Sequence, residues 1–154
     1  YVFELKNDLI KYRTNPVKHK ESYGGVAHNV ARIISNHENV SFFSLMTDKE
    51  TINYLKKYKI DFLPLNKKIE KRYYGVLINK YKKFELGIAN TEAYEKYSKT
   101  TNFKFLNKNI VLDLNFSQKF IQSVVNQNFK KNHITICGTS LFKIHKVKKV
   151  LNIL

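Results

Sequence analysis

Cysteine, proline, glycine and tryptophan are scarce in this chain of 154 residues, which has one, two, five and none of them, respectively. The single cysteine, Cys137, excludes an internal disulfide, and its apolar neighbours predict a buried strand residue rather than a nucleophile. The histidines are scattered without metal-ligand spacing, so we expect no metal site in this chain. No apolar run approaches the ~20 residues that span a bilayer, and no signal-peptide pattern is present. We therefore expect a cytoplasmic protein that does not enter a membrane.

Acidic residues are also few, with 12 Asp and Glu against 28 Lys and Arg, which gives a formal net charge of +16. So basic a domain raises the question of nucleic-acid binding. However, only Arg13, Arg32 and Arg72 carry the planar group favoured for contacts to phosphates and base edges, and the lysines are spread along the chain. We expect nucleic acid not to be the main partner. The alternative kept open is a non-catalytic basic α/β module that binds RNA or a regulatory ligand.

Segments with the patterns of strands and of helices alternate along the chain, which predicts an α/β fold. The run Ile110-Val111-Leu112 is short and fully apolar, as in a strand buried on both faces. Ser117 can cap the helix that follows, and His133 to Cys137 has the pattern of the next strand. Two apolar stripes predict helical faces: Phe120, Ile121, Val124 and Val125, then Ile144, Val147, Leu151 and Leu154. We expect a Rossmann-like core with a mostly parallel sheet flanked by helices.

A different pattern lies between about Pro64 and Ala89. Apolar and aromatic residues alternate from Tyr73 to Ile78, and a lysine-rich connection leads to a second run that starts at Phe84. This pattern predicts a β-hairpin with two usable faces. From the sequence, a plain surface hairpin and a lid over a ligand are equally good interpretations.

Two adjacent glycines open an apolar helix in the run Tyr23-Gly24-Gly25-Val26-Ala27-His28-Asn29-Val30-Ala31. Glycine adopts backbone angles that other residues avoid, and it lets a ligand approach the main chain. Val26, Val30 and Ile34, with Ala27 and Ala31 beside them, repeat at helical spacing, which predicts a buried face. Asn29 falls one turn into this helix, where it can reach back toward a ligand at the glycines. The run is compatible with a tight turn before a buried helix and with a backbone-lined binding site.

In their order along the chain, these segments resemble the ribokinase-like, or PfkB-type, carbohydrate kinases, and within that family most nearly the pseudouridine kinases. The first likeness is an Asn-Pro pair at Asn15-Pro16, followed by the Gly-Gly-Val-Ala-x-Asn-x-Ala motif that starts at Gly24. The remaining matches are weaker: the strand Val40 to Phe43 before a capping box at Thr47-Asp48-Lys49-Glu50, a lid strand at Tyr73–Leu77, a return strand at Gly87–Asn90, and a core strand Val111–Asn115 that ends in Asp-x-Asn.

The resemblance implies a kinase that uses ATP and Mg²⁺ to phosphorylate a primary hydroxyl of a sugar or nucleoside, with pseudouridine as the first candidate. By family position, Gly24 and Gly25 would approach the sugar hydroxyls through their backbone, and Asn29 would hydrogen-bond them. Asn15 and the lid residue Tyr74 would line the same pocket. The resemblance further implies one partial ribokinase-like domain over residues 1–154, with lid strands within about 1–15 and 66–90. We also expect that two copies of the chain form a homodimer through the lid.

The chain also departs from the family pattern. The Gly-Ala-Gly-Asp motif that carries the catalytic aspartate is absent, and the Asn-x-x-Glu motif is expected in the same missing half. A strand with an early Gly-Gly and a substrate-binding Asp is expected before Tyr1, and Val17 replaces the glycine expected after Asn-Pro. Asp113 and Asn115 end a core strand, where they suit a ligand site and a turn equally well. We therefore expect the substrate-binding part of a kinase, with no catalytic residue and little or no turnover by itself.

Overall fold

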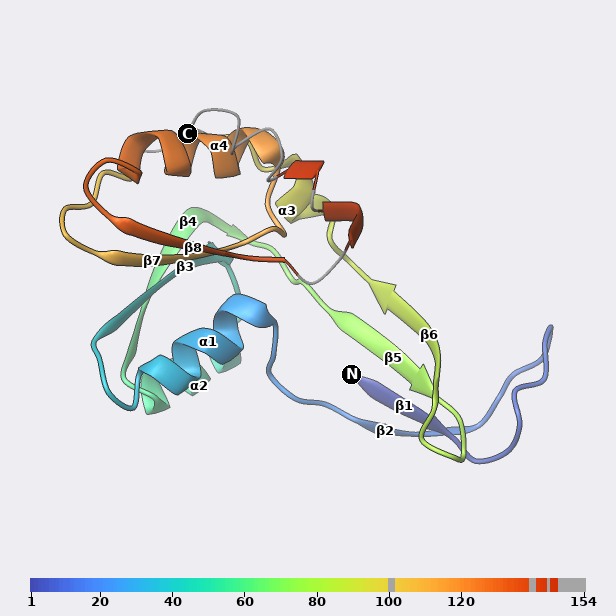
Figure 1. The fold of residues 1–154 in the computed structure, drawn as a ribbon. Helices are drawn as coiled ribbons and strands as arrows, with labels where there is room; N and C mark the ends of the chain where they lie inside the picture. The colour runs from blue at the N-terminus through green and yellow to red at the C-terminus, as the bar shows by residue number, and fades with distance from the viewer. Residues whose placement is uncertain (100–101, 139–140, 144, 147–154) are drawn as a thin grey trace.

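The structure is a computed structural model that describes residues 1–99, 102–138, 141–143, 145 and 146. Figure 1 shows the core strands between helices α1 (Val26–Ile34) and α2 (Lys49–Lys57) on one side and α4 (Gln118–Asn128) on the other, with a separate sheet projecting from this core. The four core strands are β3 (Val40–Met46), β4 (Ile60–Ile69), β7 (Asn109–Asp113) and β8 (His133–Cys137). They form two parallel pairs, β3 with β4 and β7 with β8. The predicted α/β fold with parallel strands and flanking helices is confirmed.

Among the described residues, the α-helices are α1 (Val26–Ile34), α2 (Lys49–Lys57), α3 (Glu92–Lys96) and α4 (Gln118–Asn128), and a short 3-10 helix covers Leu141–Lys143. Ser117 caps α4 as predicted, because its hydroxyl accepts a hydrogen bond from the backbone N–H of Phe120 at 3.2 Å. A helix does open at the predicted capping box, but its cap is Asp48 rather than Thr47. The Asp48 carboxylate accepts from the backbone N–H of Thr51 at 2.9 Å.

The main hydrophobic core lies where α4 packs against β7, β8 and the segment around α3. The predicted face of α4 forms its centre: Phe120, Ile121, Val124 and Val125 are each at most 6% exposed. A smaller cluster of Ala31, Leu55 and Ile60 joins α1, α2 and β4.

The predicted buried face of α1 is confirmed only in part. Ala31 is buried as expected, in the cluster with α2 and β4. Val26, Ala27 and Val30 are only half-buried, Ile34 is 37% exposed, and the other buried residue of α1 is His28.

The projecting sheet contains β1 (Val2–Leu5), β2 (Val17–Lys20), β5 (Tyr74–Ile78) and β6 (Phe84–Ala89) in the order β2-β1-β5-β6. The β5–β6 hairpin confirms the predicted hairpin, although its start differs. The residues from Pro64 to Ile69 belong to β4 and pair with β3 in the core. We call the four-stranded sheet the lid sheet.

One lid strand also differs from its predicted range of about 1–15. The strand β2 begins at Val17, after Pro16, and pairs antiparallel with β1. The residues before it form a loop that the side chain of Asn15 closes.

Three further expectations have mixed outcomes. Cys137 lies in β8 as predicted, but it is half-buried rather than buried. The predicted last helix, with its stripe from Ile144 to Leu154, lies outside the described residues. Within the part of the chain that the structure describes, none of the helices is both long and apolar enough to cross a membrane.

Candidate functional site

Gly24 and Gly25 leave the N-terminus of α1 open. Gly25 is the N-cap residue, with φ 109° and ψ 151°, a conformation that is essentially restricted to glycine. A Cβ atom added at either glycine would meet no atom within 4 Å. No side chain caps the helix, and its first turn has no acidic residue. The amides of the first turn and the positive end of the helix dipole are therefore free to meet a polar ligand.

Asn29 and His28 lie in the first turns of the same helix. Asn29 is exposed, and its Oδ1 lies 3.3 Å from Nδ1 of His28. His28 is 6% exposed, and its Nε2 has no hydrogen-bond partner. The His28 ring stacks on Tyr54 at a centroid distance of 5.6 Å, and Tyr54 stacks on Tyr23 at 4.0 Å. Burial lowers the pKa of His28, so the ring favours its neutral form. His28 is therefore buried within this aromatic stack.

The two weaker candidates lie elsewhere. The Asn15 side chain accepts from the N–H of Ile10 at 2.8 Å and donates to the carbonyls of Ile10 and Arg13, each at 2.8 Å. These bonds give Asn15 a role in its own loop, which Figure 1 shows at the end of the lid sheet away from the core. Tyr74 begins β5 and is 52% exposed, with its hydroxyl close above Gly87 of β6. The roles of both residues in a pocket stay predictions.

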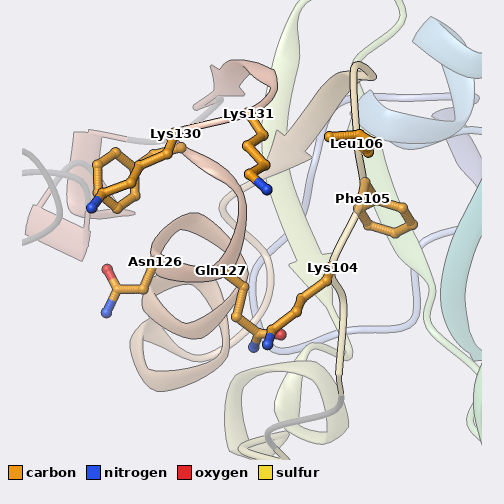
Figure 2. A pocket seen from close by; sticks show the side chains of 8 residues that line it. Lys104, Phe105, Leu106, Asn126, Gln127, Lys130 and Lys131 are labelled. Atoms are coloured by element: carbon orange, nitrogen blue, oxygen red, sulfur yellow. The ribbon is translucent and has the colours of Figure 1, made fainter.

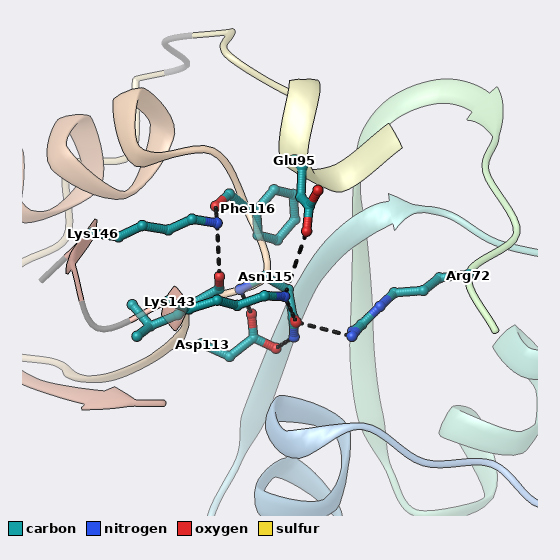
Figure 3. A network of polar contacts seen from close by, with 8 residues as sticks. Arg72, Glu95, Asp113, Asn115, Phe116, Lys143 and Lys146 are labelled. Carbon is teal, nitrogen blue, oxygen red and sulfur yellow. Dashed lines mark hydrogen bonds and ion pairs between the residues drawn. The ribbon is translucent and has the colours of Figure 1, made fainter. Parts of the chain in front are cut away.

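Asp113 and Asn115 follow the carboxyl end of β7, where ligands bind in open α/β sheets. Asn115 is 5% exposed. Asp113 accepts from the Asn115 backbone N–H at 3.0 Å and from its Nδ2 at 2.7 Å, which fixes the orientation of the amide. The free Oδ1 of Asn115 then accepts from Arg72 Nη2 at 2.9 Å and from Lys143 Nζ at 3.0 Å (Figure 3). Sequence reasoning missed Arg72 and Lys143, because no local pattern joins them to Asn115.

A buried lysine also lies close to the Asp113–Asn115 turn. Lys146 is 9% exposed, and its Nζ donates to the carbonyls of Leu114 at 3.1 Å and Phe116 at 2.8 Å. Burial, and to a lesser extent the charge of Lys143, lowers the pKa of Lys146. The ribbon of α1 runs below Asp113 in Figure 3, and α1 does lie against β7. The structure therefore brings α1 and the Asp113–Asn115 turn into one region.

A shallow basic groove of about 670 Å³ lies at the opposite edge of the same strands. Figure 2 shows Lys104, Phe105 and Leu106 on one side of it and the end of α4 on the other. Lys130 and Lys131 belong to the turn that leads into β8. Because its residues precede β7 and β8, the groove is separate from the site at their carboxyl ends.

Two solved structures of kinases match this fold. A carbohydrate kinase from Agrobacterium tumefaciens matches with a TM-score of 0.74 at 14% identity, over 97% of this chain and 53% of that one. A nucleoside kinase from Methanocaldococcus jannaschii, an archaeal member of the ribokinase family, matches with a TM-score of 0.63 at 15% identity, over 88% and 47%. No protein-family model and no curated protein sequence matches. The chain has the ribokinase-like fold and spans about half the length of the kinases it matches.

Proposed function

We propose that this chain is the substrate-binding part of a ribokinase-like kinase that phosphorylates a primary hydroxyl of a sugar or nucleoside. The observation that supports this proposal best is the open N-terminus of α1 at Gly24 and Gly25, with the exposed amide of Asn29 one turn further. Sugar hydroxyls both donate and accept hydrogen bonds, so free backbone amides and one carboxamide suit them. The kinase neighbours support the same class of substrate. Pseudouridine is the first substrate that we propose to test.

In this proposal the chain binds and orients, and it does not carry the chemistry alone. Backbone amides at Gly25 and the side chain of Asn29 hold the hydroxyls, while Tyr74 on the lid sheet limits the access of water. The complete enzyme would work in the cytoplasm with ATP and Mg²⁺. Among the residues that the structure describes, no group of His, Cys, Asp or Glu could hold a metal ion. We therefore assign no Mg²⁺ ligand here and expect little or no turnover from the isolated chain.

The lid sheet also supports the proposed homodimer. Its edge strand β6 exposes Leu86 and Ile88, which are 53% and 51% exposed and lie two residues apart on one face of the strand. A second copy of the chain would cover this apolar face. Sedimentation analysis should show a dimer that the Leu86→Glu variant converts to a monomer. A monomeric wild-type chain at high concentration would refute this part of the proposal.

Calorimetry with pseudouridine, uridine, ribose and fructose tests the substrate site. If Asn29 contacts the sugar, Asn29→Ala should weaken binding about fivefold to tenfold, which is the effect of one lost hydrogen bond. The matched control is Asn36→Ala, which removes an exposed amide just beyond α1 and should leave affinity unchanged. Equal affinities of the wild type and Asn29→Ala for every ligand would refute the proposed site.

The basic groove favours the second candidate function, which is binding of RNA. Three lysines line it together with the half-buried rings of Phe105 and Phe129. Lysines that face phosphates would make RNA binding weaken steeply with salt. Replacement of Lys104, Lys130 and Lys131 by Gln should then reduce both the affinity and the slope with salt. Binding of nucleosides that is insensitive to salt, without RNA binding, would favour the kinase instead.

A further inference from the structure

Two cationic side chains converge on one neutral oxygen at the carboxyl edge of β7. Arg72 Nη2 and Lys143 Nζ lie 2.9 Å and 3.0 Å from Oδ1 of Asn115 (Figure 3). An amide oxygen accepts both bonds but cannot neutralise either charge. Asp113 is near, but both of its oxygens accept from Asn115. The arrangement is one in which a bound anion would be more favourable than the neutral acceptor.

The surrounding groups leave positive charge and donors unused. Arg72 Nε is buried without a hydrogen-bond partner, which carries a cost unless a ligand accepts from it. Lys146 donates to two carbonyls, so one of its three N–H groups is left for another acceptor. The Glu95 carboxylate lies 3.7 Å from Lys143 Nζ, and its side chain is 46% exposed, so solvent screens this pair. Of these three cations, Lys143 alone forms an ion pair with a carboxylate among the described residues.

We infer that Arg72, Lys143 and Lys146 form a binding site for the phosphoryl group of a phosphorylated ligand. A phosphoryl group offers three terminal oxygens, so it can accept from several donors that come from different segments of the chain. Arg72 approaches from the segment before β5, and the two lysines approach from the segment after β8. A ligand oxygen would join or replace Oδ1 of Asn115 between Arg72 and Lys143. This site follows from charge and hydrogen bonding and does not require the chain to be a kinase.

Titration of the chain with inorganic phosphate at constant ionic strength, followed by nuclear magnetic resonance, tests this site. We expect the amide signals of Asn115 and the Arg72 Nε–H signal to shift with saturation. Arg72→Gln and Lys143→Gln should each weaken binding about tenfold, because each removes a charge-assisted hydrogen bond. The control Lys57→Gln makes the same change of charge on the exposed end of α2 and should leave affinity unchanged. Thermal unfolding checks each variant, and the partly exposed Lys143 can be replaced even if Arg72→Gln fails to fold.

Ribose 5-phosphate and ATP then distinguish the two sources of a phosphoryl group. The ligand whose affinity falls in Lys143→Gln identifies the source as a sugar phosphate or a nucleotide. Absence of phosphate binding by the wild type, or equal weakening by Lys57→Gln, would overturn the inference. Phosphate binding without nucleoside or sugar binding would keep this site and refute the substrate proposal. Binding of a nucleoside or sugar without binding of phosphate would refute this site and keep the substrate proposal.

Discussion

Replacement of each glycine before α1 by alanine should separate backbone strain from ligand access. Gly25 has φ 109° and ψ 151°, whereas Gly24 has no positive φ. In that region a residue with a Cβ is strained by about 1–3 kcal/mol. Alanine also restricts the unfolded chain more than glycine does, which raises the free energy of unfolding of either variant by about 0.4–1 kcal/mol. Gly25→Ala should therefore lower the free energy of unfolding by roughly 1–2 kcal/mol, and Gly24→Ala should leave it unchanged or slightly raise it.

Thermal unfolding measures this difference. For a chain of this size, 1 kcal/mol corresponds to about 2–4 °C, so Gly25→Ala should unfold roughly 2–8 °C below the wild type. Neither added Cβ meets an atom of the protein, so both methyl groups would enter the space that we assign to the substrate. Gly24→Ala should then weaken sugar or nucleoside binding without loss of stability. Equal unfolding temperatures of the two variants would refute the strain, and unchanged binding by Gly24→Ala would refute the proposed approach to the backbone.

Three further predictions concern stability. Asn128 is 1% exposed and accepts from the N–H of Phe105 at 2.9 Å while it donates to the carbonyl of Phe103, so Asn128→Ala should cost roughly 2–4 kcal/mol in urea unfolding. Ser117→Ala removes the cap of α4 and should cost about 1 kcal/mol in the same assay, whereas Ser117→Thr keeps a hydroxyl that can both cap the helix and donate to the carbonyl of Tyr97, so it should retain most of the stability. Burial lowers the pKa of His28 below its ordinary value of about 6.5. As the pH falls, the imidazole is therefore protonated in the unfolded chain before it is protonated in the folded chain. Stability should therefore fall as pH drops below about 6.5, and His28→Gln should reduce the fall in the urea midpoint between pH 7.5 and 5; identical pH profiles would contradict this.

Features that depend on neighbouring residues could be predicted from the sequence. The start of α1 after Gly25, the Ser117 cap and the apolar face of α4 are set by a few adjacent positions, and all three are present. The β5–β6 hairpin is similarly local. These elements were enough to predict the fold class.

Features set by packing between distant segments could not be predicted. The buried face of α1 depends on Leu55 and Ile60, and a pattern within α1 cannot indicate which of its apolar sides they will meet. The extension of β4 to Ile69 depends on pairing with β3, whose Met46 is its partner. The hydrogen bonds of Asn15 to Ile10 and Arg13 form only when its loop folds, and its role in a pocket stays a prediction.

The proposed phosphoryl site shows why overall charge is a poor guide to the ligand of this protein. Arg72 and Lys143 lie 43 and 28 residues from Asn115 in sequence, so only the folded chain brings them together. In a chain with 28 basic residues, the two lysines cannot be distinguished from the others by composition. Burial distinguishes them, because Lys146 is the one buried lysine among the residues that the structure describes and the Lys143 side chain is only 19% exposed. A buried cation loses hydration and needs compensation from nearby groups, whereas an exposed lysine does not. The cations that report on a ligand are therefore the few that the fold desolvates at the edge of the sheet, and the remaining charge sets only the general attraction for anions.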